Sequence, residues 1–142
     1  MPSIAKRSID AETAMLALKA AVHKADTLNL KMCITVTDEA GHVKASLRMD
    51  GAQLAAMQVA TNKAYSAAAT KMATHLWYDA IKNDPPLLHG MPHIPQLVIF
   101  GGGYPIKEDN EIIGAIGVSG GHYLQDMECA CAGLDAIGAP TS

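Results

Sequence analysis

Residues 32–49 have the sequence MCITVTDEAGHVKASLRM, and this stretch decides the fold. Over residues 32–38, apolar side chains alternate with Cys and Thr, which is the period-two pattern of a half-buried strand. Residues 38–41 supply a turn that ends in glycine, and residues 42–49 can then return as the partner strand. The stretch therefore predicts a β-hairpin and, with it, an antiparallel sheet.

The segments on either side of the hairpin are predicted to be helical. Before it, Asp10 is a candidate N-cap, and an amphipathic helix should continue to about residues 28–29. Its apolar stripe is expected to contain Met15, Leu18, Val22 and Ala25. After it, residues 52–72 contain many alanines and neither proline nor glycine, which favours one long helix that Asp50 could cap.

The second half of the chain repeats this alternation of helix and strand. Residues 74–83 favour a further helix, and residues 84–95, which hold four of the seven prolines, favour an ordered loop. Residues 96–100 and 111–118 are the third and fourth predicted strands, and a last helix follows. Its apolar face is expected to contain Leu124, Met127, Cys131 and Leu134. The order of elements predicts an α+β fold with helices covering an antiparallel sheet.

Length and composition limit the class of protein. The 142 residues fit a single domain over residues 1–142, and 49% hydrophobic with 18% charged residues exclude a disordered chain. A net charge of −3 argues against a nucleic-acid partner, and no apolar run reaches the roughly 20 residues of a membrane span. Three cysteines without framework spacing favour free thiols, and no signal peptide is visible. We expect a cytoplasmic protein that binds neither nucleic acid nor membrane.

Two glycine clusters, residues 101–103 and 119–121, stand at predicted strand ends. A strand, a glycine turn and a helix start point backbone N–H groups outward, where an anionic group can bind. The alternative is that these glycines only permit tight turns. The nucleotide-binding glycine patterns are missing from the sequence, so a nucleotide ligand is not indicated.

Three charged residues could serve a pocket that receives carboxylates. Arg48 and Asp50 follow a strand that ends abruptly, and Lys63 stands in an alanine-rich stretch with no other charge nearby. A guanidinium grips a carboxylate with two hydrogen bonds, and burial among apolar residues would lower the pKa of a lysine. The structural alternative is an Arg48–Asp50 ion pair and a Lys63 side chain that reaches solvent.

Histidines and cysteines give no predicted metal site. His89 and His93 are four residues apart, but the intervening glycine and prolines exclude the helix that would bring them together. His122, where the last helix should begin, is better placed to accept a proton or coordinate a metal as a neutral imidazole. Cys129 and Cys131 point to different sides of a helix and are interpreted as core residues.

Five blocks of the sequence, in order, resemble the GlcG/HbpS haem-binding-like family. They are VTDEAG at residues 36–41, RMDGA at 48–52, NKAYSA at 62–67, FGGGYPI at 100–106 and IGAIGVSGG at 113–121, followed by Gln125 and Asp126. The resemblance covers roughly residues 8–137. It extends to the C-terminal domain fused to some corrinoid adenosyltransferases.

This resemblance implies a profilin-like (PAS-like) fold, with a five-stranded antiparallel sheet and helices on both faces. It also implies homo-oligomers, from dimers to octamers, and in some relatives haem binding, redox sensing or an accessory role in a catabolic operon. The family positions with implied pocket roles are Arg48, Asp50, Lys63, Gly102, Gly103, Gly120, Gly121 and Asp126. The family's Thr after the last glycine pair is replaced here by His122.

The leading functional hypothesis is binding of a small anionic ligand, with haem or another carboxylated tetrapyrrole as the first candidate. In it Arg48 and Lys63 hold carboxylates, the glycine turns donate hydrogen bonds, and His75 or His122 reaches the iron. The alternative is a cofactor-independent enzyme of small-carboxylate or aromatic catabolism, with Arg48 as the anchor and Lys63, His122 or Asp126 as acid or base. A third hypothesis is an oligomeric scaffold with a vestigial pocket, so whether the protein is an enzyme stays open.

Overall fold

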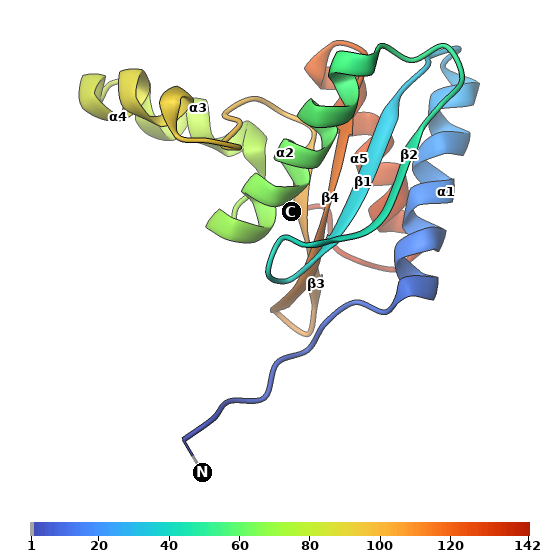
Figure 1. Ribbon diagram of the computed structural model, residues 1–142, viewed down its shortest axis with the longest axis horizontal. Helices are drawn as coiled ribbons and strands as arrows, with labels where there is room; N and C mark the ends of the chain where they lie inside the picture. The colour runs from blue at the N-terminus through green and yellow to red at the C-terminus, as the bar shows by residue number, and fades with distance from the viewer. Residues whose placement is uncertain (1) are drawn as a thin grey trace.

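A computed structural model describes residues 2–142 of the chain, so only Met1 of the expected domain lies outside it. Helices and strands alternate along the chain, and a short helical arm separates the two halves (Figure 1). The first half comprises α1 (Ala11–Thr27), β1 (Cys33–Asp38), β2 (Val43–Arg48) and α2 (Leu54–Thr70). The arm comprises the 3₁₀ turn η1 (Thr74–Leu76), α3 (Trp77–Ile81), α4 (Pro85–Gly90) and the 3₁₀ turn η2 (Met91–His93). The second half comprises β3 (Gly103–Glu108), β4 (Glu111–Ser119) and α5 (Tyr123–Ala136).

The sheet has four strands in the order β2-β1-β4-β3, and every neighbouring pair is antiparallel. The predicted β1–β2 hairpin is confirmed, and β3 and β4 form a second hairpin. The two hairpins join through β1 and β4, which pair from Cys33 opposite Ser119 to Asp38 opposite Gly114. The α+β class is therefore confirmed, whereas the expectation of five strands is wrong for the described residues.

The predicted strand over residues 96–100 does not form, and the third strand begins only at Gly103. The Ser66 side chain on α2 replaces a neighbouring strand here: its hydroxyl donates to the Gln96 carbonyl and accepts from the Val98 N–H, at 2.8 and 2.9 Å. The Ser66 side chain thus holds residues 96–98 against α2. Phe100 follows in the same irregular segment, directly before the first glycine cluster.

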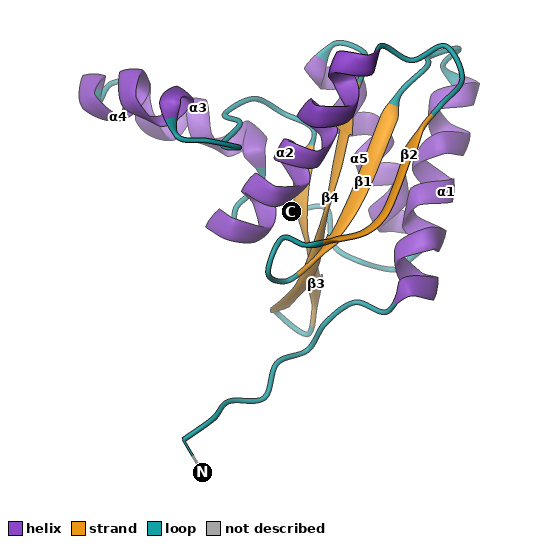
Figure 2. Ribbon diagram, in the orientation of Figure 1, coloured by secondary structure: helices purple, strands orange, loops and turns teal. Residues whose placement is uncertain are grey.

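Helices cover both faces of the sheet, as expected (Figure 2). The larger core lies between the sheet and the pair α1 and α5, and the strand residues facing it include Ile34, Val36, Ile116 and Val118. On the opposite face α2 packs mainly on β4 and β1, where Cys33 lies against alanines of α2. The alternation read in residues 32–38 therefore separates two layers of different character, a branched aliphatic core and an alanine-lined contact.

The predicted apolar stripes are confirmed at Leu18, Ala25 and Leu134, which lie on the buried faces of α1 and α5. Small residues dominate them: Ala14, Ala17, Ala21 and Ala25 on α1, and Cys129, Ala130 and Gly133 on α5. Met15 and Leu124, assigned to the stripes, are 42% and 63% exposed. Because α1 and α5 pack directly against each other, small side chains between them allow a close approach that larger ones would prevent.

The first part of the arm, η1 and α3, is helical as predicted, but α4 and η2 are helical where a loop was expected. The Asp84 carboxylate accepts a hydrogen bond from the Leu87 N–H, and Pro85 occupies the first turn of α4, where its missing N–H costs nothing. The proline-rich composition therefore starts a short helix. The arm extends away from the sheet layers, and α4 has no buried residue (Figure 1). Asp50 was expected to cap α2, but the cap position is held by Gln53 without a side-chain bond.

The contact between α2 and β4 depends on the absence of a side chain at Gly117. A Cβ atom there would collide with the Ala60 carbonyl oxygen and lie 2.5 Å from the Ala64 nitrogen. Both of these are backbone atoms of α2, so relief requires the whole helix to move. Since α2 also carries Lys63, this spacing positions the site described below.

We predict that Gly117→Ala lowers the free energy of unfolding by about 1–3 kcal/mol, the usual cost of overpacking a core contact. Urea denaturation of the purified variant measures the change. Gly90→Ala is the matched control, because a Cβ at Gly90 meets nothing within 4 Å and its φ of −86° suits any residue. Equal stability of the two variants would contradict the proposed contact.

Candidate functional site

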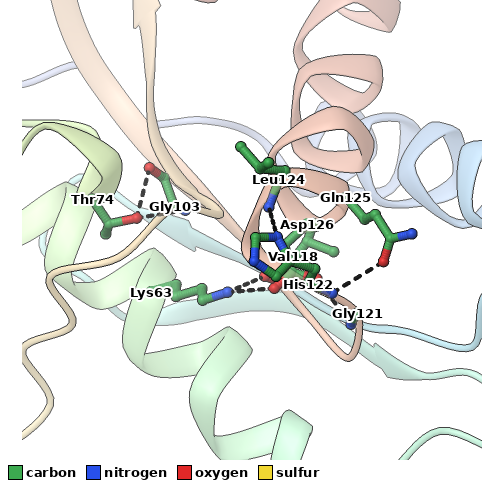
Figure 3. Close-up of polar contacts among 9 residues, drawn as sticks. All are labelled: Lys63, Thr74, Gly103, Val118, Gly121, His122, Leu124, Gln125 and Asp126. Carbon is green, nitrogen blue, oxygen red and sulfur yellow. Dashed lines mark hydrogen bonds and ion pairs between the residues drawn. The ribbon is translucent and has the colours of Figure 1, made fainter.

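The centre of the molecule holds a buried ion pair between Lys63 of α2 and Asp126 in the first turn of α5. The Lys63 Nζ lies 2.7 Å from the Asp126 Oδ2, and their side chains are 0% and 3% exposed. Figure 3 shows the lysine reaching from its helix toward the turn where β4 ends and α5 begins. Sequence analysis placed both residues in a pocket, and the structure brings them into direct contact.

The Lys63 ammonium contacts two hydrogen-bond acceptors and one aromatic ring. Besides Asp126, it donates to the Val118 carbonyl at 2.9 Å, and it lies over the Phe100 ring, 5.0 Å from the ring centroid. Burial lowers the pKa of Lys63, and the attraction of Asp126 opposes part of this effect. Burial likewise raises the pKa of Asp126, against the attraction of the lysine. With two hydrogen bonds, a cation–π contact and no exposure, this amine is a structural link between α2, β4 and α5.

The missing side chain at Gly102 makes room for the Lys63 ammonium. Gly102 has a φ of +127°, and a Cβ there would lie 2.7 Å from the Lys63 Nζ and 2.6 Å from the Val118 carbonyl oxygen. Any larger residue would therefore be strained and would displace the ammonium. Gly102, for which the family resemblance implied a pocket role, lies beside Lys63 and leaves the space that the ammonium occupies.

The other glycines of the two turns use their N–H groups within the protein. The Gly103 N–H donates to the Thr74 hydroxyl at 2.9 Å, and the Gly121 N–H donates to the Asp126 Oδ1 at 3.0 Å (Figure 3). Gly120 lies against the backbone of residues 31–32. The donors at Gly103 and Gly121, which sequence analysis assigned to an anionic ligand, are therefore already satisfied.

His122 forms the N-cap of α5. Its Nδ1 accepts a hydrogen bond from the Leu124 N–H at 3.2 Å, and its own N–H donates to the Gln125 side chain at 3.0 Å. The ring stacks on Tyr123, with centroids 4.1 Å apart. With His122 as the N-cap, only the Nε2 of its ring is left for other contacts.

A cavity of about 580 Å³ lies between the arm and the body of the domain. It is lined by His75, Tyr78, Asp79, Ile99, Phe100, Gly101, Tyr123, Leu124 and Met127. Of the predicted site residues only His75 lines it. Sequence analysis missed the aromatic and aliphatic walls, although Leu124 and Met127 were noticed as an apolar stripe and attributed to the core.

His75 is held at the junction of arm and body. Its neighbour Thr74 is fully buried and bridges the arm to Gly103 at the start of β3. The imidazole packs on Tyr104, with centroids 5.3 Å apart, and its Nδ1 is buried without a hydrogen-bond partner in the structure. Burial lowers the pKa of His75 from its ordinary value of 6.5. The side chain therefore presents a neutral imidazole beside the cavity.

Arg48 and Asp50 lie in a different place. They line a separate surface hollow of about 280 Å³ together with Asp26 and Lys31, and both are exposed. One Arg48 nitrogen donates to the Ala52 carbonyl at 3.3 Å, and the ion pairs found among residues 2–142 do not include Arg48 with Asp50. The structure thus does not bring Arg48 into the cavity that His75 borders.

The cysteines and acidic residues of the described chain do not build a metal centre, since no group of three or more potential ligands gathers within residues 2–142. Cys129 is buried in the core as predicted, and burial raises the pKa of its thiol to about 11. Over the same residues, the helices are too short or too polar to traverse a bilayer.

Comparison with known proteins places this geometry in a family. The model of a family described as haem degrading protein HbpS-like matches residues 9–135. The chain belongs to the HbpS-like family. This agrees with the resemblance that the five sequence blocks indicated.

Relatives of this HbpS-like chain include larger proteins. It is 35% identical over 124 residues to the corrinoid adenosyltransferase PduO of Salmonella typhimurium, which covers 87% of this chain but only 37% of PduO. Among solved structures, Klebsiella pneumoniae protein ORFY superposes with a TM-score of 0.91 at 32% identity, covering 99% of this chain and 97% of that one. A PduOC:haem complex superposes with a TM-score of 0.88 at 32% identity, covering 94% and 98%.

We predict that Lys63→Met lowers the free energy of unfolding by about 3–5 kcal/mol, because it leaves a buried carboxylate without its partner. The double variant Lys63→Met/Asp126→Asn should recover most of this loss, since a neutral amide can still accept from the Gly121 N–H. Chemical denaturation measures both variants. Lys82→Met is the control, because its pair with Asp79 is exposed and should contribute little. A double variant no more stable than Lys63→Met would exclude the charge as the cause.

We predict that His75 titrates below 6.5 and makes stability pH-dependent. As pH falls through 6.5 the unfolded chain binds a proton at this histidine while the folded chain does not, so stability decreases. NMR titration of the imidazole and urea unfolding at pH 7.5 and 5.5 measure these effects. His75→Gln should reduce the loss of stability at the lower pH, whereas His93→Gln, at an exposed position, should leave it unchanged. A midpoint at or above 6.5 would refute the prediction.

Proposed function

We propose that the protein binds haem, or another carboxylated tetrapyrrole, in the cavity between the arm and the domain body. The observation that carries this proposal is a neutral, half-buried imidazole, His75, beside an apolar cavity of about 580 Å³ with three aromatic walls. Ligand sites for flat apolar molecules have this composition, with few polar groups placed to orient the ligand. A haem complex of a relative at 32% identity supports the same ligand class.

The residues present fit such a group in a specific way. Because the Nδ1 of His75 is buried, its Nε2 is the atom left to coordinate an iron. No lysine or arginine is among the cavity's lining residues, so the carboxylates of the ligand would extend into solvent at the open side. Arg48 and Lys63 therefore have no part in holding them. Bound haem would supply an iron that changes oxidation state and takes further ligands, which suits a storage, sensing or accessory role.

The alternative of a cofactor-independent enzyme acting on small carboxylates is not favoured by the geometry. It requires Arg48 as an anchor close to an acid or base at Lys63, His122 or Asp126. Lys63 and Asp126 are buried and satisfy each other, and Arg48 lines another hollow. The hollow that Arg48 lines has none of the three proton-transfer candidates among its lining residues.

A homo-oligomer, from dimer to octamer, remains part of the proposal. The support is the arm: α4 buries no residue within the chain, and Leu87 and Ile94 are 45% and 50% exposed. Burial of this apolar surface between copies would be favourable. The cytoplasmic location and the role as an operon accessory stay predictions.

Titration of the purified protein with haemin, followed by absorbance, tests the proposed function. We expect a saturable Soret band that is lost or strongly shifted in His75→Ala and unchanged in His122→Ala. His89→Ala is the matched control, because that residue is exposed on the arm and remote from the cavity lining. Non-saturating spectra that are identical in all four proteins would exclude specific haem binding.

A further inference from the structure

The Phe100 ring lies between the buried lysine and the cavity. The Lys63 Nζ is 5.0 Å from its centroid on one side, and the lysine itself is inaccessible to solvent. Phe100 nevertheless remains 48% exposed and lines the cavity together with His75, Tyr78 and Tyr123. The ammonium thus covers one face of the Phe100 ring, and we infer that the other face is turned toward the cavity.

We propose that the free face of Phe100 is the platform on which the flat ring system of the ligand stacks, and that the Lys63 ammonium fixes the ring in this position. The choice of a tetrapyrrole rests on the function proposed above. Stacking on Phe100 selects more generally for flat, electron-rich ligands, whatever their metal content.

The lysine can act as this support because it is itself immobile. Its Nζ is held by the Asp126 carboxylate and the Val118 carbonyl, and Gly102 leaves the room that it occupies. Phe100 in turn stands at the end of an irregular segment, where no strand pairing restrains it. A cation under the ring replaces that restraint, and a ring ordered before binding loses less conformational entropy when the ligand arrives.

The ammonium also determines which ligands suit the platform. An aromatic ring attracts a cation through the negative potential of its faces, and Lys63 already uses this potential from one side. A cluster of Phe100, Tyr78 and Tyr123 could otherwise resemble an aromatic cage for a quaternary ammonium ligand. Asp126 offsets part of the Lys63 charge, but the ammonium already occupies one face of Phe100, so the outer face is a poorer site for a second cation and suits the π-surface of a neutral or anionic ligand. The nearby Asp79 does not reverse this preference, because Lys82 pairs with it at 3.3 Å.

Binding of metal-free protoporphyrin IX, followed by its fluorescence, tests the platform without iron coordination. We expect Phe100→Leu, which keeps an apolar side chain but removes the ring, to weaken binding about tenfold, as the loss of one aromatic stack does. Phe100→Trp should bind about as well as the unchanged protein. Tyr123→Leu is the matched control, since it removes another ring of the same cavity without a cation behind it, and its loss should be clearly smaller.

The outcomes separate the two proposals. Equal losses in Phe100→Leu and Tyr123→Leu, with unchanged far-UV circular dichroism, would overturn the platform and leave general hydrophobic contact. If porphyrin binding depends on Phe100 but the haemin spectrum is unchanged in His75→Ala, the platform is supported and iron coordination by His75 is refuted. Absence of binding by both porphyrins would overturn both proposals.

Discussion

The buried contact between Lys63 and Asp126 ties α2, β4 and α5 together at the centre of the domain. Lys63 comes from the helix on one face of the sheet and Asp126 from a helix on the other. The ammonium also donates a hydrogen bond to the Val118 carbonyl near the end of β4. A single unpaired charge buried here would strongly destabilise the fold, because its lost hydration would not be replaced. Each charge of the pair compensates the other. The position of the ammonium requires Gly102 without a side chain, and it brings the Lys63 Nζ over the Phe100 ring. The charge pair therefore specifies the geometry of the glycine turn more than it adds stability.

Much of the fold could be predicted because local patterns agreed with the final packing. The alternation in residues 32–38, the glycine turn after it and the Asp10 cap all act over a few residues, and the structure has each of them. The failures came where a distant residue replaced a local partner. Residues 96–100 have a strand-like composition, yet the Ser66 hydroxyl takes the hydrogen bonds that a strand would need. Hydrophobicity correctly placed Leu18 and Leu134 in the core but misplaced Met15 and Leu124, which are exposed. Close packing of α1 on α5 favours small residues such as Ala14 at the contact.

The site was predictable in its chemistry and less so in its arrangement. The family blocks drew attention to Lys63, Gly102 and Asp126, and these do lie together, but as a self-satisfied unit. Arg48 resembled a carboxylate anchor only because its distance from Lys63 across the fold was unknown. The aromatic walls escaped notice because they come from the arm, from a segment without regular structure and from the exposed side of α5. Leu124 and Met127 were noticed in the sequence as an apolar stripe, but only the structure shows that both line the cavity.

The walls of the cavity differ in how strongly they are anchored to the core. Phe100, Tyr123 and Met127 belong to the body, whereas His75 and Tyr78 belong to a projection whose outer helix buries nothing. Segments with few buried contacts open at a lower free energy than the global unfolding transition. For the ligand proposed above, the residence time would then depend on the stability of the arm, while the core sets the lifetime of the fold. Substitutions along the arm can consequently retune ligand exchange over evolution without endangering the folded state.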